Sequence, residues 1–287
     1  MASPADVSVV ILTKNEERLI ARAIASAWWA AEVVVVDSGS TDRTCEVAAA
    51  LGAKVYRQEW LGWRLQHEAA AALAGHDWIF SVDADEIITP GLGAAIIAAL
   101  RANPDPRDGF VLERREEFLG TLMPNMRRHS RRKSFVRLYN RRYSHYDTDL
   151  DIHEVVRCPG KLIPLEGVLL HWRNYTIGQQ ADTLNANAEI EARMLVRNGR
   201  RFGRLWLVGK PFLRFLWLYV WCGNWRFGIK GYVWSMLHSG AEFLRQARAW
   251  ELQSVPPATH PAPSVWTPDV EYQNKLQSTA SGSPPAE

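Results

Sequence analysis

An apolar run of strand length, residues 78–82, breaks directly into the acidic tetrapeptide Asp83-Ala84-Asp85-Glu86. Such a run is typical of a buried strand, and the acids then lie at its carboxyl end. In open α/β sheets, ligands bind outside the carboxyl ends of the strands. Two aspartates one residue apart suit a divalent cation that also takes oxygens from a substrate diphosphate. The junction therefore predicts an α/β fold with an acidic ligand site at one edge of its sheet.

Two earlier segments repeat this arrangement of a strand and a polar loop. Residues 7–12 are mostly β-branched and lead into Thr13-Lys14-Asn15-Glu16-Glu17, and residues 33–36 are all valine and lead into Asp37 and a glycine-containing turn. Apolar residues at helical spacing follow each loop, and a further helical stretch, 64–73, precedes the acid pair. The alternation predicts a Rossmann-like, mostly parallel sheet flanked by helices.

Three motifs in order resemble those of glycosyltransferase family 2, which has a GT-A type of nucleotide-sugar-binding domain. They are Ile11-Leu12-Thr13-Lys14-Asn15-Glu16-Glu17, Asp37-Ser38-Gly39-Ser40-Thr41-Asp42-Arg43-Thr44 and the strand with its acid pair, residues 78–86. The chain is most similar to the branch of lipopolysaccharide core β-1,4-glucosyltransferases, and the resemblance is most specific from about Val7 to Leu92. It continues more loosely through His153-Glu154 and Leu170-His171-Trp172 and ends near Trp250.

The resemblance implies an inverting, metal-dependent hexosyltransferase. We expect it to move glucose from UDP-glucose onto a heptose-type hydroxyl of a lipopolysaccharide inner core. Another UDP-sugar donor, or a polyprenyl-linked glycan or a peptide as the acceptor, is the alternative within the family. An acid-pair phosphohydrolase and a non-catalytic protein that binds anions or membranes are the alternatives of another class.

The resemblance also assigns roles to side chains at the strand ends. Asp85 is expected to bind Mg2+ or Mn2+ directly, and Asp83 to contact the ribose, or the metal through water. His171, which ends the strand-like residues 168–170, is expected to be a third metal ligand or a sugar contact, with simple packing as the alternative. The residues expected to bind the nucleotide are Thr13, Asn15, Glu16, Asp37 and Gln66. Loop capping is the alternative for Glu16 and Asp37.

The general base is expected after the acceptor segment, where relatives carry a His-Glu pair. Glu154 is the candidate, because an inverting displacement needs a carboxylate or an imidazole within reach of the acceptor hydroxyl. Asp147, Asp149 and Asp151 are nearby competitors, and an ion pair with an arginine is the alternative for Glu154. Glu86 is a candidate for orienting the substrate.

Composition indicates the setting of this chemistry. The three cysteines are widely spaced, which favours neither a disulfide framework nor a zinc site and indicates a reducing, cytoplasmic environment. No basic region followed by an apolar core opens the sequence, so no cleavable signal peptide is expected. The segment from Arg127 to Arg142 is rich in Arg and Lys and contains no acid. Since it matches no nucleic-acid recognition module, we expect it to face a diphosphate, an acidic lipid acceptor or a membrane surface.

Aromatic residues concentrate after residue 200. Residues 205–222 are mostly apolar, but Lys210, Pro211 and Arg214 interrupt them, and the stretch is short for a membrane span. Trp, Tyr and basic residues at its edges favour an amphipathic helix in the membrane interface. A buried helix, a dimer contact in a homo-oligomer and a true span are the alternatives.

These observations predict three regions. A catalytic domain covers 1–175, with a nucleotide half at about 5–100 and an acceptor half at 101–175. An aromatic-rich helical extension that binds a membrane or a partner covers 176–252. A tail dominated by Pro, Ser, Thr and Ala, 253–287, is expected to be disordered. The protein would be a peripheral enzyme on the inner face of the inner membrane.

Overall fold

The computed structural model describes residues 5–124, 135–147, 155–173, 175–199 and 204–254. Within them a nine-stranded sheet has the order β3-β2-β1-β4-β8-β6-β11-β5, with β7 paired to β6, and β9 pairs with β10 separately. The strands are β1 (Ala5–Thr13), β2 (Ala30–Asp37), β3 (Lys54–Arg57), β4 (Trp78–Asp83), β5 (Glu86–Ile88), β6 (Gly109–Phe118), β7 (Thr121–Leu122), β8 (Val136–Asn140), β9 (His145–Tyr146), β10 (Val156–Arg157) and β11 (Leu162–His171). The helices are α1 (Ile20–Ser26), α2 (Thr44–Ala50), α3 (Trp63–Leu73), α4 (Pro90–Arg101), α5 (Ile177–Arg197), α6 (Arg204–Leu216), the π-helix η1 (Trp217–Trp221), the 3-10 helix η2 (Asn224–Phe227) and α7 (Gly228–Ser254).

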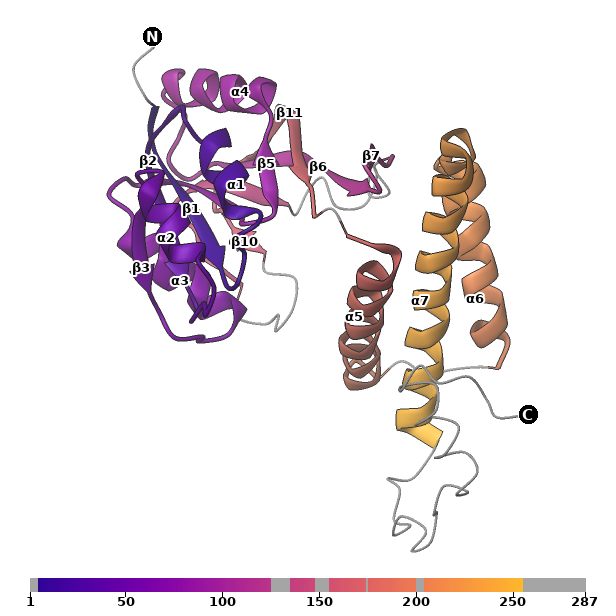
Figure 1. Ribbon diagram of the computed structural model, residues 1–287. Coiled ribbons are helices and arrows are strands. Elements are labelled where there is room, and N and C mark those ends of the chain that lie inside the picture. The colour runs from indigo at the N-terminus through magenta and orange to yellow at the C-terminus, as the bar shows by residue number, and fades with distance from the viewer. Residues whose placement is uncertain (1–4, 125–134, 148–154, 174, 200–203, 255–287) are drawn as a thin grey trace, which may run out of the picture.

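Strand β1 shows why helices cover both faces of the sheet. Val7, Val9 and Ile11 belong to one core cluster, whereas Val10 and Leu12 belong to another. Side chains alternate between the two faces of a strand, so a continuous apolar run requires a cover on each side. Helices α1, α2 and α4 contribute to the first cluster and α3 to the second (Figure 1). The predicted α/β fold class, with helices flanking the sheet and a C-terminal helical extension, is confirmed.

Strands β1 to β4 run parallel, and their carboxyl ends meet at one edge of the sheet. Strand β1 pairs in parallel with β2 and with β4, and the registers place Thr13 opposite Asp37 and Leu12 opposite Asp83. Strand β8 then lies antiparallel between β4 and β6, so the acceptor half of the sheet is mixed. The acidic edge that the sequence predicts is therefore shared by the first three long strands.

Helix α4 packs closely on β11 because Gly167 has no side chain. Gly167 has a φ of 96°, and a Cβ atom there would lie 2.5 Å from the backbone nitrogen of Leu92. The same end of α4 is capped by Thr89, whose hydroxyl accepts the N–H of Leu92 at 3.3 Å. This close approach fixes β11, and hence His171 at its end, against the nucleotide half.

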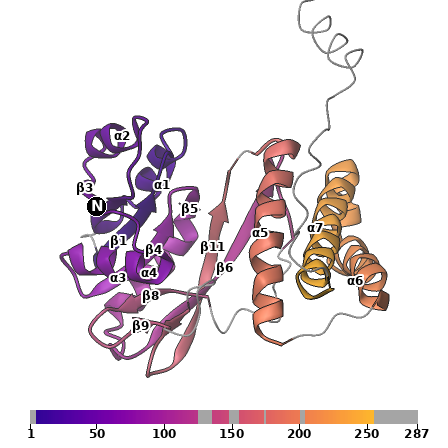
Figure 2. The same cartoon turned by 90° about the horizontal axis from the view of Figure 1, so that it is seen from below.

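The three long helices are anchored to the sheet through the outer end of β6. Strand β6 extends toward the helices (Figure 2) and turns into β7, where the hydroxyl of Thr121 accepts from Lys230 of α7 at 3.0 Å. Phe118, Met123 and Trp234 form a separate buried cluster there. The ammonium of Lys230 donates to the carbonyl oxygen of Leu119 at 2.7 Å. The helices lie in the stretch for which the sequence predicts an extension, and the tail from residue 255 lies outside the described residues.

Helix α5 begins at a capping box, and α6 ends in an irregular turn. Thr176 accepts the N–H of Gln179, whose side chain accepts the N–H of Thr176 in return. Helix α6 contains Pro211 and passes directly into the π-helix η1. Among the described helices, none has both the length and the apolar composition that crossing a bilayer requires.

Candidate functional site

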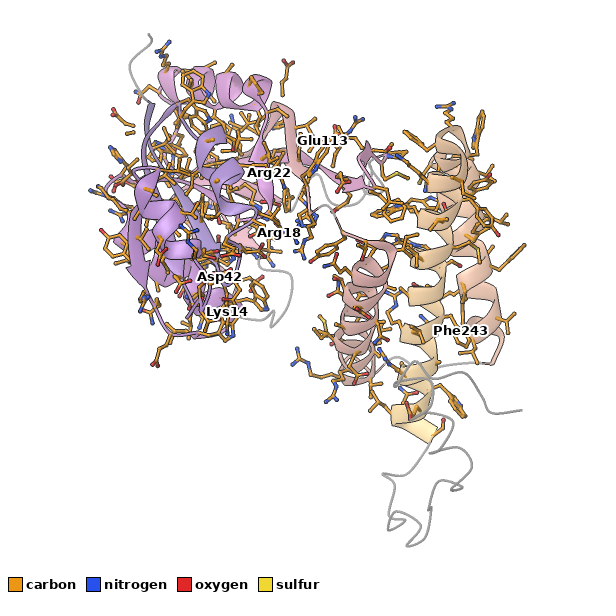
Figure 3. The ribbon with its side chains drawn as sticks, in the orientation of Figure 1. Lys14, Arg18, Arg22, Asp42, Glu113 and Phe243 are labelled. Carbon is orange, nitrogen blue, oxygen red and sulfur yellow. The ribbon has the colours of Figure 1, made fainter. Side chains whose placement is uncertain are left out.

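The loops after β1 and β2 are bonded to each other at the acidic edge, where Lys14 and Asp42 lie at the same end of the domain (Figure 3). Asn15, with a φ of 56°, donates its backbone N–H to the hydroxyl of Ser40 at 2.8 Å. Its side-chain oxygen accepts the N–H of Thr41, also at 2.8 Å. Asparagine tolerates this left-handed backbone better than most residues. Asn15 therefore holds the two loops together at the expected nucleotide position.

Asp37 and Gln66 are buried, and their side chains form hydrogen bonds with the loop that follows β2. The carboxylate of Asp37 accepts the N–H of Ser40 at 3.0 Å and also its hydroxyl. Burial opposes ionisation of Asp37, but the bonds from Ser40 outweigh it and lower the pKa of Asp37. The amide of Gln66 donates to the hydroxyl of Ser38 at 3.0 Å and accepts the N–H of Leu61 at 3.2 Å. Both side chains thus shape the loops, in line with the capping alternative for Asp37.

Thr13 ends β1, and Glu16 lies in the loop that follows it. The hydroxyl of Thr13 is buried and has no hydrogen-bond partner within the described part of the chain. The backbone N–H of Glu16 donates to the hydroxyl of Thr44 at 2.8 Å. Burial and the nearby charge of Asp85 raise the pKa of the Glu16 carboxyl. The Glu16 carboxyl therefore lies near Asp85, and the Thr13 hydroxyl lies at the carboxyl end of β1.

The end of β11 lies against the acid pair through backbone and side-chain contacts. The N–H of Trp172 donates to the carbonyl oxygen of Asp85 at 2.9 Å, and Arg22 on α1 donates to the carbonyl oxygen of Trp172 at 3.0 Å. Arg173 follows on the chain, and its Nε lies 2.5 Å from Oδ2 of Asp85. Its Nη1 also bonds the hydroxyl of Tyr175.

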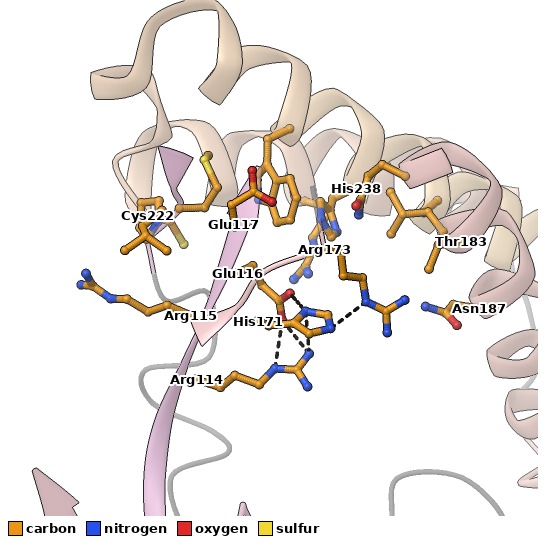
Figure 4. A pocket seen from close by; sticks show the side chains of 18 of the residues that line it. Arg114, Arg115, Glu116, Glu117, His171, Arg173, Thr183, Asn187, Cys222 and His238 are labelled. Atoms are coloured by element: carbon orange, nitrogen blue, oxygen red, sulfur yellow. Dashed lines mark hydrogen bonds and ion pairs between the residues drawn. The ribbon is translucent and has the colours of Figure 1, made fainter. Parts of the chain in front are cut away.

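His171 is brought to Asp85 by the pairing of β11. That strand pairs with β5 on one side and β6 on the other, which places His171 opposite both Glu86 and Glu116. Nε2 of His171 lies 3.2 Å from Oδ2 of Asp85. Nδ1 of His171 bonds the carboxylate of Glu116, as Figure 4 shows. Two of the predicted metal ligands, far apart in sequence, are thus adjacent.

The charges around His171 favour its protonated form. Burial and the nearby Arg114 both oppose protonation, but Glu116 and Asp85 outweigh them and raise the pKa of His171 to about 9. Burial likewise opposes ionisation of Asp85, yet His171 and Arg173 hold the pKa of Asp85 below its usual range. Asp85 is therefore ionised at neutral pH.

Glu86 organises the inner side of the acid pair and is completely buried. Its Oε2 accepts the backbone N–H of Asp83 at 3.0 Å, and its Oε1 lies 3.1 Å from Arg114 and 3.4 Å from Arg137. Arg137 also lies 3.1 Å from Oδ2 of Asp83. Burial raises the pKa of Glu86 despite the two arginines, whereas Arg137 and Arg114 outweigh burial at Asp83 and lower its pKa. Glu86 thus orients Asp83 and two cations, rather than a substrate directly.

Three residues of this site, Arg114, Glu116 and Arg173, were not singled out from the sequence. Nη2 of Arg114 lies 2.7 Å from the Glu116 carboxylate, and both project from the same face of β6. The signal for Arg114 and Glu116 was the run of five charged residues at 113–117, which is also typical of a solvent-exposed strand. Only the pairing of β6 with β11 distinguishes the two interpretations.

The donor set around Asp85 fits a hydrated divalent cation. Oδ1 of Asp85 is buried and has no hydrogen-bond partner among the described residues. Mg2+ and Mn2+ prefer oxygen ligands and often take only one or two protein carboxylates, with substrate phosphates and waters completing the shell. In the described ranges no group of three or more His, Cys, Asp or Glu side chains is arranged to hold a metal by itself. Asp85 would hold such a cation together with a diphosphate, and His171 would join it through Nε2 once the cation displaces the proton on that nitrogen.

The described cations of the basic segment bind groups of the protein itself. Arg141 donates to the carbonyl oxygens of Ala71 and Ala74 at the end of α3, both at 2.7 Å. Arg142 lies 2.8 Å from Asp77. The expectation that the segment faces an external anion is therefore wrong for these two arginines, because they complete the end of a helix and an ion pair. The arginines and lysine between 127 and 133 lie outside the described residues.

The candidate base Glu154 lies outside the described residues, together with Asp149 and Asp151. Of its competitors, Asp147 is described and is nearly buried. Its carboxylate forms an ion pair with Arg157 at 2.5 Å. The Asp147 carboxylate is therefore already engaged by a residue of the protein itself.

A cleft of about 1370 Å³ opens beside this site, between the sheet and the helical extension. Strands β6 and β11 contribute Arg114, Glu116 and His171 to one wall. The opposite wall comes from α5, η1 and α7 and includes Thr183 and Asn187 (Figure 4). The cleft is large enough for several sugar rings and leads directly to the Asp85–His171 contact.

Comparisons with known proteins identify the family to which the chain belongs. The model of the family described as glycosyl transferase family 2 matches residues 8–159. An uncharacterized glycosyltransferase of Rickettsia typhi is 30% identical over 256 residues, which cover 86% of this chain and 87% of that protein. The lipopolysaccharide core biosynthesis glycosyltransferase LpsC of Rhizobium meliloti is 29% identical over 250 residues, which cover 85% of this chain and 92% of that protein.

Among solved structures, glucosyl-3-phosphoglycerate synthase from Mycobacterium tuberculosis, in complex with Mn2+, UDP and glucosyl-3-phosphoglycerate, is similar over 69% of this chain and 81% of that chain. The sequence identity is 19% and the TM-score 0.43. The family model covers more than half of the chain and includes all three strand-end motifs. The chain belongs to glycosyltransferase family 2 and is a glycosyltransferase.

Proposed function

We propose that this enzyme transfers a hexosyl group, with inversion, from a UDP-sugar to a lipopolysaccharide inner-core acceptor, and that it requires Mg2+ or Mn2+. UDP-glucose is the first donor to test. The observation that carries the proposal is the contact of Asp85 with His171, which lines the cleft; their side-chain atoms lie 3.2 Å apart. Family membership leaves no role for the phosphohydrolase and the non-catalytic alternatives.

The donor assignment is supported by the loops at the acidic edge. Asn15, Asp37 and Gln66 shape the loops expected to hold uracil and ribose, and Thr13 and Glu16 have polar atoms beside them. A metal at Asp85 and His171 would neutralise the diphosphate as negative charge develops on it. The three motifs resemble those of family members that use UDP-sugars.

The acceptor assignment is supported by a relative and by the cleft. The relative of Rhizobium meliloti that covers most of this chain is named for lipopolysaccharide core biosynthesis. The cleft of about 1370 Å³ presents both carboxylates and arginines, which suit a hydroxylated and charged acceptor. A polyprenyl-linked glycan or a peptide is the alternative occupant.

The described residues have distinct roles in the proposed transfer. Arg173 lies against Asp85 and would place a positive charge beside the leaving diphosphate. Glu116 bonds His171 at Nδ1 and orients its Nε2 toward Asp85. Glu154 is the proposed general base that takes the proton of the acceptor hydroxyl. Asp147 is a poorer candidate because Arg157 already pairs with it.

Donor choice is tested by thermal stabilisation. The melting temperature is measured with UDP-glucose, UDP-galactose, UDP-N-acetylglucosamine and GDP-mannose, each with and without Mn2+. A ligand that binds only the folded state raises the melting temperature. The largest metal-dependent rise is expected with UDP-glucose. A larger rise with another UDP-sugar would replace glucose, and a rise with GDP-mannose alone would overturn the UDP assignment.

Acceptor choice is tested by transfer of radiolabelled sugar. The acceptors are a lipopolysaccharide truncated to its inner core, a polyprenyl-diphosphate glycan and a peptide, and the control enzyme is Glu154→Gln. Label is expected on the core lipopolysaccharide alone. Label on a different acceptor would refute the lipopolysaccharide assignment, and full turnover by Glu154→Gln would refute its role as base.

A further inference from the structure

The outer side of the helical extension carries large apolar side chains that no described residue covers. Six of them on α6, η1 and the start of α7 are each at least 58% exposed. We call them the outer face: Val208, Phe212, Leu213, Val220, Trp221 and Ile229. A large exposed apolar patch on a folded protein marks a surface that binds something.

The outer face is held outward by the packing on the opposite side of the same helices. Leu218 is completely buried between them, and Phe215 stacks on Tyr219 with ring centroids 5.3 Å apart. The hydroxyl of Ser239 on α7 donates to the carbonyl oxygen of Pro211 on α6. Rotating α6 to bury the outer face would therefore expose an equally apolar side.

The charged residues of the segment that carries the outer face are all basic, although Lys210 also lies 3.9 Å from Glu242 on α7. The sequence from Arg193 to Ala241 contains no Asp or Glu. Three cations in this stretch lie over tryptophan rings, 4.9 to 5.4 Å from the ring centroid. These pairs are Lys210 with Trp206, Arg214 with Trp217 and Arg226 with Trp225. Tryptophan beside basic side chains suits the headgroup layer of a membrane that contains anionic lipid.

Charge also distinguishes this occupant from a second copy of the chain. Two outer faces brought together would place like charges opposite one another, which is unfavourable at an interface. An anionic lipid surface is complementary to the same charges and accepts the apolar side chains between its headgroups.

The outer face continues into the cleft of the transfer site. Trp217 and Trp221 line the cleft and are also 36% and 83% exposed. Glu116, His171 and Arg173 line the same cleft. A surface bound at the outer face would therefore lie beside the cleft that contains His171, the residue in contact with Asp85.

We propose that the outer face docks on an anionic lipid bilayer and thereby presents the cleft to an acceptor that is anchored in the same leaflet. Docking itself rests on the outer face and its charges, whereas the delivery of a lipid acceptor rests on the proposed function. The proposed partner is the membrane surface: the outer face would bind in the headgroup layer of the bilayer without spanning it.

Vesicle co-sedimentation tests the docking without any nucleotide-sugar. The full chain is mixed with vesicles of phosphatidylcholine alone or with added phosphatidylglycerol. The partition coefficient is expected to be higher on the anionic vesicles, to decrease with added salt, and to fall at least about tenfold in Phe212→Ser/Trp221→Ser. The matched control is Trp28→Ser, which removes a tryptophan that is 74% exposed on the catalytic domain and should leave partitioning unchanged.

Three outcomes would overturn the docking. The first is no binding of the wild-type chain to anionic vesicles. The second is a loss of partitioning in Trp28→Ser equal to that in Phe212→Ser/Trp221→Ser. The third is a dimer, seen by light scattering in a protein that does not bind vesicles, which Phe212→Ser/Trp221→Ser dissociates. The experiments also distinguish failure of the proposed sugar transfer from failure of the proposed membrane docking. Vesicle binding without sugar transfer to a lipid acceptor would refute the proposed function alone, and transfer without vesicle binding would refute the docking alone.

Discussion

Nε2 of His171 lies 3.2 Å from Oδ2 of Asp85, although 86 residues separate the two along the chain. The contact joins the acidic turn after β4 to the carboxyl end of β11. It therefore exists only when both halves of the sheet are assembled, and a mistake in the pairing of β11 would remove one of the two candidate metal ligands.

The substitution Asp85→Asn keeps the size of the side chain and removes its charge. We expect kcat/KM for sugar transfer to fall at least about 100-fold, because a neutral amide binds a divalent cation and Arg173 far less well than a carboxylate does. The matched control is Asp77→Asn at the opposite end of β4, where the carboxylate pairs with the exposed Arg142. Its activity should stay within roughly twofold of wild type. Equal losses in both variants would contradict the assignment.

The substitution Glu86→Gln should destabilise the fold. Glu86 is completely buried, and its two oxygens accept from the N–H of Asp83 and from Arg114 and Arg137, so the NH2 group of a glutamine would face one of these donors. We expect the free energy of unfolding, measured in urea, to decrease by about 3 kcal/mol. Glu113→Gln on β6 breaks a more exposed ion pair with Arg115 and should cost less than about 1 kcal/mol. A Glu86→Gln protein as stable as wild type would show that the cations need no buried partner.

Stability at acid pH should depend on Glu32. Burial opposes ionisation of Glu32, but bonds from Lys54, Ser8 and the backbone of Gly75 outweigh it and lower the pKa to about 2, from an ordinary value of 4.5. The stabilisation is therefore present above pH 4.5 and is lost as the pH falls toward 2.

Glu32→Gln should thus reduce the free energy of unfolding at pH 6 by up to roughly 2 kcal/mol, and the difference from wild type should shrink toward pH 3. Urea titrations at several pH values measure it. Asp105→Asn serves as the control, since its pair with Arg107 is exposed and local. A constant difference between Glu32→Gln and wild type across this range would refute the assignment.

Two glycines of α7 should respond in opposite ways to alanine. A Cβ at Gly231 would lie 1.8 Å from the carbonyl oxygen of Asn224, so Gly231→Ala must push η2 away from α7. We expect a loss of at least about 2 kcal/mol and faster proteolysis of the extension. Gly240 has open space around it, and Gly240→Ala should stabilise the helix by up to about 1 kcal/mol. Matching effects would mean that the contact of η2 with α7 is unimportant.

The sequence predicted those parts of the site that follow directly after a buried strand. Strands β1, β2 and β4 are continuous apolar runs, so their ends, and with them Thr13, Asp37 and the acid pair, are visible without a structure. The expected positions of these strands agree with the structure to within a few residues. The family resemblance then supplied their roles.

The remainder of the site depends on pairing between distant strands. Arg114 and Glu116 lie on a strand whose run of charged residues is equally typical of a solvent-exposed surface. Arg173 lies just beyond a strand end. Only the order β6-β11-β5 shows that these charges converge on His171 and Glu86. Local periodicity carries no information about which strands become neighbours.

Strand β6 carries Arg114 and Glu116 in its middle and Phe118 at its end, where the cluster with Met123 and Trp234 holds α7. One continuous backbone therefore connects the charges around His171 to the anchor of the helices. A displacement of α7 would therefore be transmitted along β6 to Arg114 and Glu116. If the helices dock on a membrane, docking would act on the transfer site through this strand.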